Sequence, residues 1–370
     1  MMWPTRHSRP VVPLLMALVS TPGCAPVARP ADTAVVASGA DLEDVAPILA
    51  VHPLTRQVHR HLQYLTLVRN DSALAIVPYL AQRWDWSADH RDVRLVLAQG
   101  VRWHDGRPTT AADVAFTLRA ARDPRAGSPR AAELAGIESV SVREPHEVEL
   151  RFRAPRRTLP QVLAELPIIP AHRWAAHDVA TWRTLAASDS SVGNGPMRLA
   201  RRRRGESWVF ERVPDFPAAL GGPSALARVV VTVVDEPATK LAGLVSGSLD
   251  MAGVSPTMAS LVARDSMLRL VSPPVLFSTV LLMHPGRAPF DDVRVRRALS
   301  RALDRRRLVD AALAGFGTPA GSAVPPGVLP GAAAVPRESV DEANALLDQA
   351  GWTRGADGVR RRGGRALEVE

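Results

Sequence analysis

Adjacent histidine and aspartate residues form the first pair in this sequence whose side chains could do chemistry. His104 and Asp105 lie in the stretch QGVRWHDGRPTTAADVAFTL, residues 99–118. A carboxylate that orients an imidazole makes the imidazole a general base, so the pair raises the hypothesis of a hydrolase. However, Asp105-Gly106 is also a strong signal for a tight turn, because glycine tolerates positive φ. We therefore expect His104 to be an edge or solvent-facing residue.

Local helix signals account for the residues that follow the turn. Thr110 can accept hydrogen bonds from the first free N–H groups of a helix, and Asp113 lies at the third helical position of a capping box. Val114, Leu118 and Ala121 then recur at the spacing of one helix face. The stretch predicts a turn and a capped helix without requiring catalysis.

The rest of the sequence offers no arrangement typical of an enzyme or a metal centre. His59 and His61 are two residues apart, a spacing that points helical side chains to different faces. Ser207 lies beside an expected hairpin turn without a neighbouring base, and no G-x-S-x-G or H-E-x-x-H motif occurs. We expect no enzyme activity, no metal and no cofactor. A secreted hydrolase is the alternative that His104 leaves open.

The N-terminal sequence indicates export from the cytoplasm. Arg6 and Arg9 precede an apolar run over 11–19, which is shorter than the roughly 20 residues that span a bilayer. Small residues then lead to Cys24, the only cysteine of the chain. We expect a signal peptide at 1–23 and a flexible tether, rich in Ala, Pro and Asp, at 24–44.

The position of Cys24 also suggests a lipid anchor. A lone cysteine that follows glycine and an apolar run resembles a bacterial lipoprotein cleavage site, where the thiol receives a diacylglyceryl group. The alternative is an ordinary signal peptide that contains a cysteine. In both cases the mature protein would be extracytoplasmic, either anchored to the cell membrane or in the periplasm.

Charge and composition restrict the partners. The 370 residues carry a net charge of +9, and arginine supplies nearly all the positive charge. The densest runs, at 201–207 and 360–365, contain glycine where a turn would fall and lack interleaved aromatic residues for base stacking. We expect solvated turns and no nucleic-acid partner, although attraction to an anionic membrane surface fits the same charge.

Hydrophobic periodicity predicts a mixed α/β fold. Alternation predicts strands at 92–98 and 146–155, two strands around a hairpin turn within 192–216, and a strand–helix–strand unit at 227–254. Helical spacing predicts helices at 57–68 and 291–313, the second with Val295, Leu299, Leu308 and Ala312 on one stripe. The wholly apolar stretch 275–283 predicts a strand buried on both faces.

Five stretches resemble, in the same order, the family 5 extracellular solute-binding proteins, which are the oligopeptide, dipeptide and nickel receptors of ABC importers. They are LAQRWDWSADHRDVRLVLAQGVRWHDGRPTTAADVAFTL, GNGPMRL with GESWVFERVPDF, VVDEPATKLAGLVSGSLDMA, APFDDVRVRRALSRALDRRRLVDAALAGFGTPAGSAVPPG and EANALLDQAGW. Together they place about residues 45–370 within the resemblance.

The resemblance implies a two-lobed α/β fold of the type II periplasmic-binding-protein class, large enough to enclose a peptide between its lobes. Lobe I would span 45–274 and the start of lobe II 275–370, with the second lobe incomplete because family members usually continue further. The resemblance also implies a monomer that captures a peptide or another small solute and delivers it to ABC permease subunits.

Family position implies which residues face the ligand. They are His52, Leu54 and Thr55 in the loop that opens lobe I, Gly193, Asn194 and Gly195 in a second loop, and Phe277, Ser278 and Thr279 on the strand that enters lobe II. Asn194 stands where the family usually has threonine. A degenerate or truncated member, which acts in signalling or quality control without high-affinity import, is the alternative. The ligand class stays open among peptides, metal chelates, opines and oligosaccharides.

Overall fold

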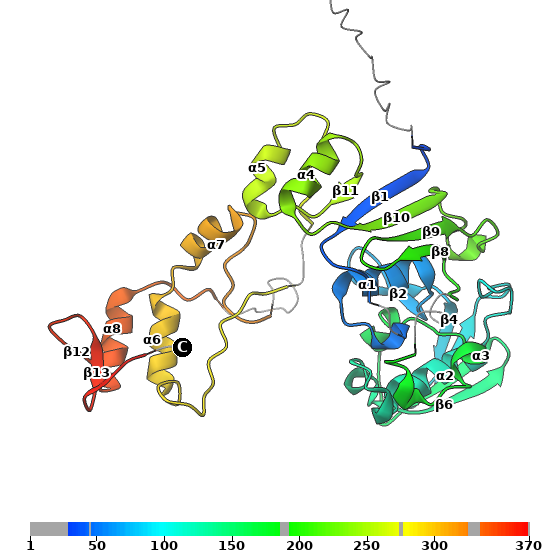
Figure 1. The fold of residues 1–370 in the computed structure, drawn as a ribbon. Coiled ribbons are helices and arrows are strands. Elements are labelled where there is room, and N and C mark those ends of the chain that lie inside the picture. Colours follow the sequence, from blue (N-terminus) through cyan, green and yellow to red (C-terminus); the bar gives the residue numbers. More distant parts are fainter. Residues whose placement is uncertain (1–28, 44–45, 186–191, 274–276, 325–333, 369–370) are drawn as a thin grey trace, which may run out of the picture.

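The structure, a computed structural model, describes residues 29–43, 46–185, 192–273, 277–324 and 334–368. These residues form a large body around two sheets and a smaller body made by the C-terminal segment (Figure 1). The large body holds two clusters of buried apolar side chains, and the smaller body holds a third around Val295, Leu347 and Trp352. The predicted signal peptide and Cys24 lie outside the described residues.

An antiparallel sheet of order β4-β5-β7-β6 and one helix form the first layers of the large body. The elements are β4 (Ala81–Trp86), β5 (Asp92–Leu97), β6 (Ile137–Glu144), β7 (Glu147–Phe152) and α2 (Ala111–Arg122). Asp113 Oδ2 accepts a hydrogen bond of 2.9 Å from the Thr110 N–H, which completes the predicted capping box. The strands predicted at 92–98 and 146–155 and the capped helix are therefore confirmed.

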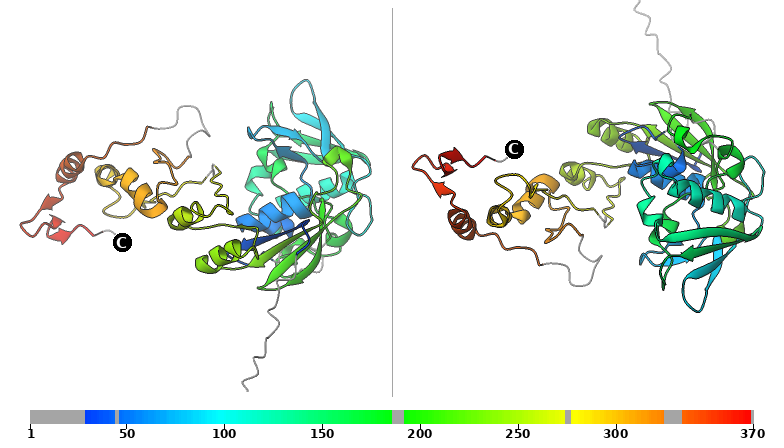
Figure 2. Two further views of the ribbon diagram at one scale, coloured as in Figure 1. Left: turned by 90° about the horizontal axis from the view of Figure 1, so that it is seen from above. Right: turned by 90° about the horizontal axis from the view of Figure 1, so that it is seen from below.

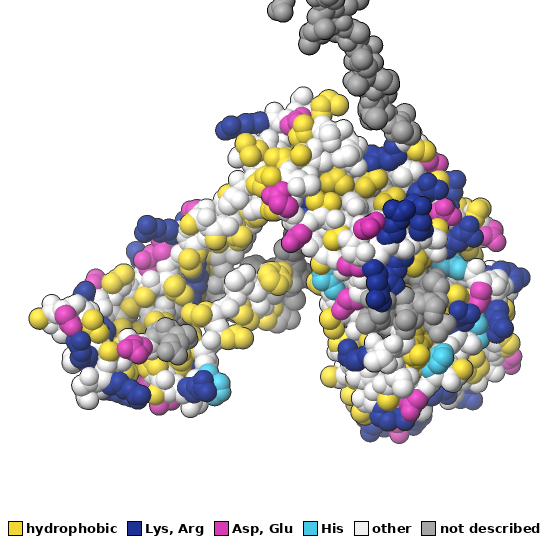
Figure 3. Space-filling view, in the orientation of Figure 1, with side chains coloured by type: hydrophobic (Ala, Val, Ile, Leu, Met, Phe, Trp, Pro, Cys, Tyr) yellow, Lys and Arg dark blue, Asp and Glu magenta, His cyan; other side chains and the backbone are white. Residues whose placement is uncertain are grey.

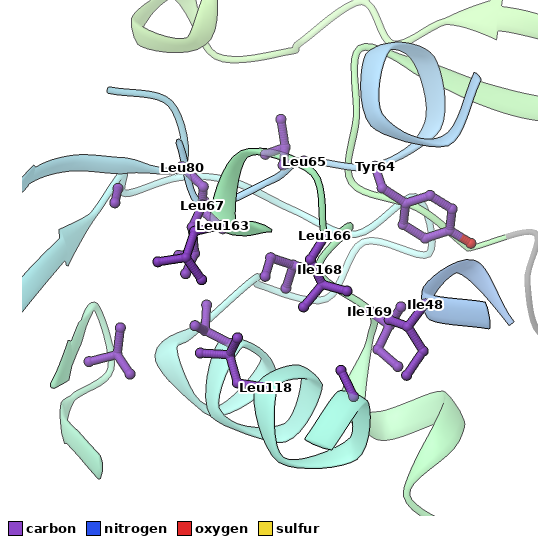
Figure 4. Close-up of a cluster of buried hydrophobic side chains, with 14 of the residues drawn as sticks. Ile48, Tyr64, Leu65, Leu67, Leu80, Leu118, Leu163, Leu166, Ile168 and Ile169 are labelled. Carbon is purple, nitrogen blue, oxygen red and sulfur yellow. The ribbon is translucent and has the colours of Figure 1, made fainter. Parts of the chain in front are cut away.

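Buried aliphatic side chains from distant segments pack against α2. In Figure 4, Leu118 of α2 lies below Ile168 and Leu163, with Leu65 and Leu67 above them. Each fully buried side chain of this size contributes roughly 1.5–3 kcal/mol relative to exposure. These layers are thus held together by side chains that come from segments far apart in the sequence.

A second sheet, of order β11-β1-β10-β9-β8, completes the large body. Its strands are β1 (Thr33–Ser38), β8 (Met197–Arg203), β9 (Ser207–Arg212), β10 (Arg228–Val233) and β11 (Met251–Ala252). The predicted hairpin is β8–β9, and the predicted strand–helix–strand unit is β10, α4 (Pro237–Val245) and β11. Both predictions are confirmed, but β10 and β11 are not neighbours, because β1 lies between them and pairs in parallel with each.

The position of β1 corrects the predicted tether. Residues 33–38 were expected to be flexible, yet they form an inner strand whose Val35 pairs with Val230 of β10. The six-residue run TAVVAS lies in an Ala-, Pro- and Asp-rich stretch, and its partner strand is almost 200 residues further along the chain. Local composition predicted a tether because only the distant partner makes this run a strand.

Two predictions for the C-terminal part are wrong. Residues 277–283 form no strand, and Leu281 and Leu282 are exposed, because no neighbouring strand covers this stretch in the described structure. The helix predicted at 291–313 is broken into α6 (Val293–Ala302) and α7 (Arg305–Leu313). Asp304 caps α7 by accepting a hydrogen bond from the Arg307 N–H, and Leu308 is exposed instead of lying on a buried stripe.

Smaller elements complete the described structure. They are β2 (Val68–Asn70), β3 (Ile76–Pro78), β12 (Thr353–Arg354), β13 (Arg360–Arg362), β14 (Arg365–Ala366), α3 (Ala171–Trp174), α5 (Ala259–Val262), α8 (Val340–Gln349) and the 3-10 turns η1 (Pro47–Leu49), η3 (Pro124–Ala126), η4 (Ala132–Leu134), η5 (Gln161–Ala164), η6 (Val179–Thr181), η7 (Ala218–Leu220) and η8 (Pro256–Met258). The helix predicted at 57–68 starts earlier and ends sooner, as α1 (Pro53–Val58) followed by the π-helical turn η2 (His59–Gln63).

Two glycines let the chain before β8 contact the backbone of η2. The Gly195 N–H donates a hydrogen bond of 2.8 Å to Gln63 O. A Cβ on Gly193 would lie 1.9 Å from Gln63 O, and a Cβ on Gly195 would lie 2.5 Å from Leu62 O. Because the atoms in the way belong to the backbone, they cannot rotate aside, so both positions require glycine.

We predict that Gly193→Ala destabilises the fold by about 1–3 kcal/mol, since its methyl group would overlap the Gln63 carbonyl. Urea denaturation measures the free energy of unfolding. Gly253→Ala is the matched control, because an added Cβ there meets no atom within 4 Å, and it should change stability by less than about 0.5 kcal/mol. Equal stability of the two variants would contradict the prediction.

Candidate functional site

His104 anchors the Gly193–Gly195 segment and is partly buried, which corrects the expectation of a solvent-facing or edge residue. The His104 N–H donates to Gly193 O (2.7 Å), the Gly193 N–H donates to His104 Nδ1 (3.2 Å), and Nε2 lies 3.0 Å from Gly195 O. Because Nδ1 accepts a hydrogen bond from the Gly193 N–H, the neutral ring carries its proton on Nε2, and this N–H donates a hydrogen bond to Gly195 O. The histidine therefore holds two chain segments together.

The catalytic hypothesis receives no support from this pair. Both ring nitrogens of His104 are bonded to backbone groups, so the imidazole has no free position for a general base. Asp105 pairs with His172 instead, with 2.7 Å between Oδ2 and Nε2. Partial burial raises the pKa of Asp105, but the hydrogen bonds from His172 and from the Arg107 N–H, with the charges of both side chains, lower it overall.

The residues expected to face the ligand at lobe I meet at the start of α1. Glu43 Oε2 accepts hydrogen bonds from the N–H groups of Val51 (2.8 Å) and His52 (2.7 Å), and the Glu43 N–H donates to Thr55 Oγ1 (3.0 Å). Thr55 is fully buried, whereas His52 and Leu54 are partly exposed and Leu54 packs against an apolar cluster. Only His52 and Leu54 present side-chain surface to a ligand.

The other expected residues fall into two groups. Asn194 is buried, with Oδ1 accepting from the Leu65 N–H (2.8 Å) and Nδ2 donating to Thr109 Oγ1 (3.3 Å). Its contacts are those of a framework residue, as are the backbone contacts of Gly193 and Gly195. Phe277 and Thr279 are exposed and Ser278 is partly buried, on an extended segment that belongs to neither sheet.

A cluster of charged side chains near α1 was missed by the sequence analysis. Arg56 of α1, Arg60 of η2 and Arg130 all donate to the carboxylate of Glu165, which follows η5. Arg56 Nη2 lies 2.7 Å and Arg130 Nη2 lies 3.1 Å from Glu165 Oε2, and Arg130 also pairs with Glu133 at 2.6 Å. The side chains of Arg60, Arg130 and Glu165 are each only 20% exposed, so the cluster is partly desolvated.

One sequence signal could have found this cluster. Arg56 and Arg60 are four residues apart, so two like charges share one helix face, which destabilises a helix unless an anion lies between them. The identity of that anion could not be predicted, because Glu165 is more than 100 residues away.

The cluster lines a small hollow. Arg56, Arg130 and Glu165 form its polar wall, and the other lining residues are Pro47, Ile48, Ala50, Leu166 and Pro167. The hollow has a volume of about 260 Å³, which includes space open to solvent. In the three views of Figures 1 and 2, α1 lies on the side of the large body that is turned toward the smaller body. This hollow is the candidate site.

Two further features of the described residues concern membranes and metal ions. None of the helices in this part of the chain is both long and apolar enough to cross a membrane. Among the same residues, no three His, Cys, Asp or Glu side chains are placed to hold a metal ion. On the face shown in Figure 3, basic side chains of the large body are interspersed with acidic ones, rather than forming one continuous basic surface.

We predict that stability falls as the pH is lowered from about 6.5 toward 4. Burial lowers the pKa of His59 to about 4, and burial with the charge of Arg198 lowers the pKa of His104, against the opposing bond to Gly195 O. The unfolded chain then binds more protons than the folded chain below an unfolded pKa of about 6.5, so the stabilisation is complete above that pH and is lost below it.

Urea denaturation at several pH values tests this dependence. His59 alone should cost roughly 2 kcal/mol between pH 6.5 and 5. His59→Phe keeps a ring against Tyr64, which His59 contacts edge-on at 5.5 Å, but it removes the proton uptake. A variant with the same pH slope as the original protein would contradict the assignment.

Comparison with known proteins places this geometry in a family. A putative ABC transporter peptide-binding protein from Brucella ovis is 25% identical over 295 residues, covering 78% of this chain and 54% of the relative. A glutathione-binding protein, GsiB, from Salmonella typhi is 28% identical over 299 residues, covering 80% and 56%. The chain thus spans about half the length of the curated relatives that it matches.

The fold comparison gives the same result. The crystal structure of NikZ from Campylobacter jejuni in complex with Ni(L-His) matches with a TM-score of 0.79 and 21% identity, covering 92% of this chain and 67% of that one. This likeness confirms the predicted two-lobed α/β fold of type II. The 370 residues cover the second lobe of that fold only in part. The model of the bacterial extracellular solute-binding proteins, family 5, middle region, matches residues 75–370. The chain therefore belongs to the family 5 bacterial extracellular solute-binding proteins.

Proposed function

We propose that this protein is the extracytoplasmic receptor of an ABC importer, which binds a peptide-like solute between its two bodies and delivers it to the permease. Family membership supports the solute-binding role, and the names of relatives support peptides as the ligand class. The observation that carries the proposal is the placement of α1, with His52 at its start, on the side of the large body that is turned toward the smaller body.

Binding would act through closure of the two bodies. A ligand that contacts both bodies stabilises the closed arrangement over the open one and so shifts the population toward it. His52 and Leu54 offer exposed surface on the large body, and Phe277, at 76% exposed, offers an aromatic face on the extended segment that precedes α6. Gly193, Asn194 and Gly195 would contribute indirectly, by fixing η2 and therefore α1.

A diacylglyceryl group on Cys24 would keep the large body close to the membrane. Arg29 is tied to the large body by hydrogen bonds to Asp250 Oδ1 (2.6 Å) and to the carbonyls of Gly247 and Ser248. Only residues 25–28 then separate the anchor from the body, so the Cα atoms of Cys24 and Arg29 are five steps along the chain and at most roughly 18 Å apart. The anchor would therefore favour delivery to a permease in the same membrane.

A second candidate function is signalling or quality control without high-affinity import. Exposed apolar side chains favour it, since Phe277 and Leu282 are 76% and 88% exposed. Figure 3 shows hydrophobic side chains gathered on the smaller body and over α4 and α5. Such surfaces suit contacts with other polypeptides as well as they suit a small ligand.

We predict that tripeptides raise the melting temperature of the 370-residue protein. Ligand at 100 times its dissociation constant adds about 2.7 kcal/mol to the stability of the folded state. Thermal unfolding and titration calorimetry against tripeptides, glutathione, Ni(L-His) and an oligosaccharide measure the effect, with glycerol as the control solute. Binding of none of these solutes would leave the second candidate function in place of import.

We also predict that Cys24→Ala releases the protein from membranes in a bacterial host, because the variant lacks the thiol that receives the lipid. The original protein should sediment with membranes and partition into detergent, whereas the variant should be recovered in the soluble extracytoplasmic fraction. Ser20→Ala is the matched control and should stay with the membranes. A soluble original protein would overturn the lipid anchor.

A further inference from the structure

A second hollow opens on the large body beside the end of β7, and it shares no residue with the hollow at α1. Its volume is about 560 Å³, which includes space open to solvent and is about twice that of the hollow at α1. All the lining residues are exposed, so this β7 hollow admits a group carried by a larger molecule. They are Gly136, Arg153, Ala154, Pro155, Arg156, Arg157 and Thr158.

The charged residues that line the β7 hollow are all basic. They are Arg153, Arg156 and Arg157, and within the described part of the chain no carboxylate lies at ion-pair distance from any of them. The positive charge extends to α2, because burial and then the charge of Arg153 lower the pKa of Arg122 at the end of that helix. An anion beside these arginines would relieve their mutual repulsion.

The acidic residues that flank the hollow in the sequence already have other partners. Glu133 accepts a hydrogen bond of 2.6 Å from Arg130. Glu138 lies 3.6 Å from Arg151, which also pairs with Asp92 at 2.9 Å. The anion that would balance the arginines of the β7 hollow therefore has to come from outside the described chain.

Backbone contacts hold the loop after β7 in place. The Arg153 N–H donates to Gly136 O (3.0 Å), and the Arg156 N–H donates to His90 O (2.9 Å). The guanidinium carbon of Arg156 lies 5.5 Å from the centre of the ring of Phe152, which is buried. This cation–π contact restricts the Arg156 side chain. A site whose donors are already held in position loses less conformational entropy when it binds.

The donors that remain suit a phosphate group better than a carboxylate. Arg153 donates through Nε to Ala135 O (3.3 Å), which leaves both of its terminal nitrogens. The side chains of Arg156, Arg157 and Thr158 make no hydrogen bond among the described residues. Three guanidinium groups and a hydroxyl suit a tetrahedral group with several acceptor oxygens, whereas a carboxylate offers two oxygens in one plane.

The position of the β7 hollow in the fold bears on the source of the phosphate. Gly136 directly precedes β6, and β6 and β1 lie at opposite ends of the large body in Figure 1. Arg29, which precedes β1, would lie within roughly 18 Å of an anchor at Cys24. Such an anchor would leave the hollow turned away from the membrane, which favours a soluble phosphate ester over a lipid headgroup.

We propose that the β7 hollow is an anion site, in which Arg153, Arg156 and Arg157 bind the phosphate group of a soluble phosphate ester. Thr158 adds a hydroxyl donor from the same loop. The remainder of the ester extends into solvent, because the hollow is open. This site is separate from the proposed solute site and does not depend on it.

Titration calorimetry of the 370-residue protein in a low-salt buffer without phosphate tests this site. Glycerol 3-phosphate is the probe, with acetate as the carboxylate control and glycerol as the neutral control. We expect glycerol 3-phosphate to bind with a Kd of about 1 mM or lower and at least about 5-fold more tightly than acetate. High salt should weaken the binding, because it screens exposed charges.

Arginine variants assign the binding to the β7 hollow. Arg156→Gln and Arg157→Gln should each weaken binding at least about 3-fold, and together about 10-fold, because each removes charge-assisted hydrogen bonds. Both side chains are exposed, and thermal unfolding checks that the variants are folded. Arg143→Gln is the matched control, since it removes one exposed positive charge from the same sheet, where Arg143 pairs with Glu149 at 2.6 Å. It should keep the affinity.

Vesicle flotation separates the two sources of phosphate. The Cys24→Ala protein, which lacks the thiol for a lipid at this position, should not float with phosphatidylcholine vesicles that contain phosphatidylglycerol. Flotation that is lost when Arg156→Gln and Arg157→Gln are added would assign the hollow to a lipid headgroup and overturn the soluble ester as its ligand.

The remaining outcomes are equally decisive. Absence of binding to glycerol 3-phosphate, or acetate binding of the same strength, overturns the phosphate site. Equal losses in Arg143→Gln and Arg157→Gln overturn it as well, since the effect would then follow net charge alone. Inorganic phosphate that binds as tightly as the ester supports the site, because the phosphate group is the part recognised. Peptide binding is measured with different ligands, so failure of one proposal leaves the other standing.

Discussion

The close backbone contact between Gly193–Gly195 and Gln63 is the constraint on which the arrangement of the large body depends. It brings the start of β8 against η2, and His104 extends the junction to the turn before α2. Asn194 closes the same junction from a buried position, through Leu65 and Thr109. The two sheets, whose apolar clusters are separate, are therefore joined at this junction by a small set of polar contacts. A Cβ on either glycine would overlap the backbone of η2, and a proton on Nδ1 of His104 would remove the acceptor of the Gly193 N–H.

Two carboxylates hold the polar and charged groups around α1 in place. Glu43 holds the N–H groups at the start of α1, and Glu165 gathers Arg56, Arg60 and Arg130 around its end. The position of α1 therefore depends on two acidic side chains from outside the helix. An excess of arginine is ordinary on a solvated surface, but here Arg60 and Arg130 are partly buried, and Arg56 and Arg130 line a hollow beside α1.

The smaller body follows the same local rules with less packing. Asp292 and Asp304 cap α6 and α7, and α6 packs against α8 around Val295 and Leu347. The apolar residues at 277–283 have no neighbouring strand in the described structure. Apolar side chains such as Leu281 and Leu282 are therefore exposed, and the stretch does not form a buried strand. A strand buried on both faces requires neighbours on both faces, and sequence pattern alone cannot supply them.

The sequence by itself determined the elements whose causes are local. The turn at Asp105-Gly106, the capping box of Thr110 and Asp113 and the hairpin β8–β9 each depend on residues that are close in the sequence, and family motifs identified the fold class. Tertiary structure alone decided that residues 33–38 are an inner strand, that His104 binds two backbone segments, and that three arginines meet at Glu165. The physical reason is that pairing, burial and charge compensation depend on partners up to almost 200 residues away, which only folding brings together.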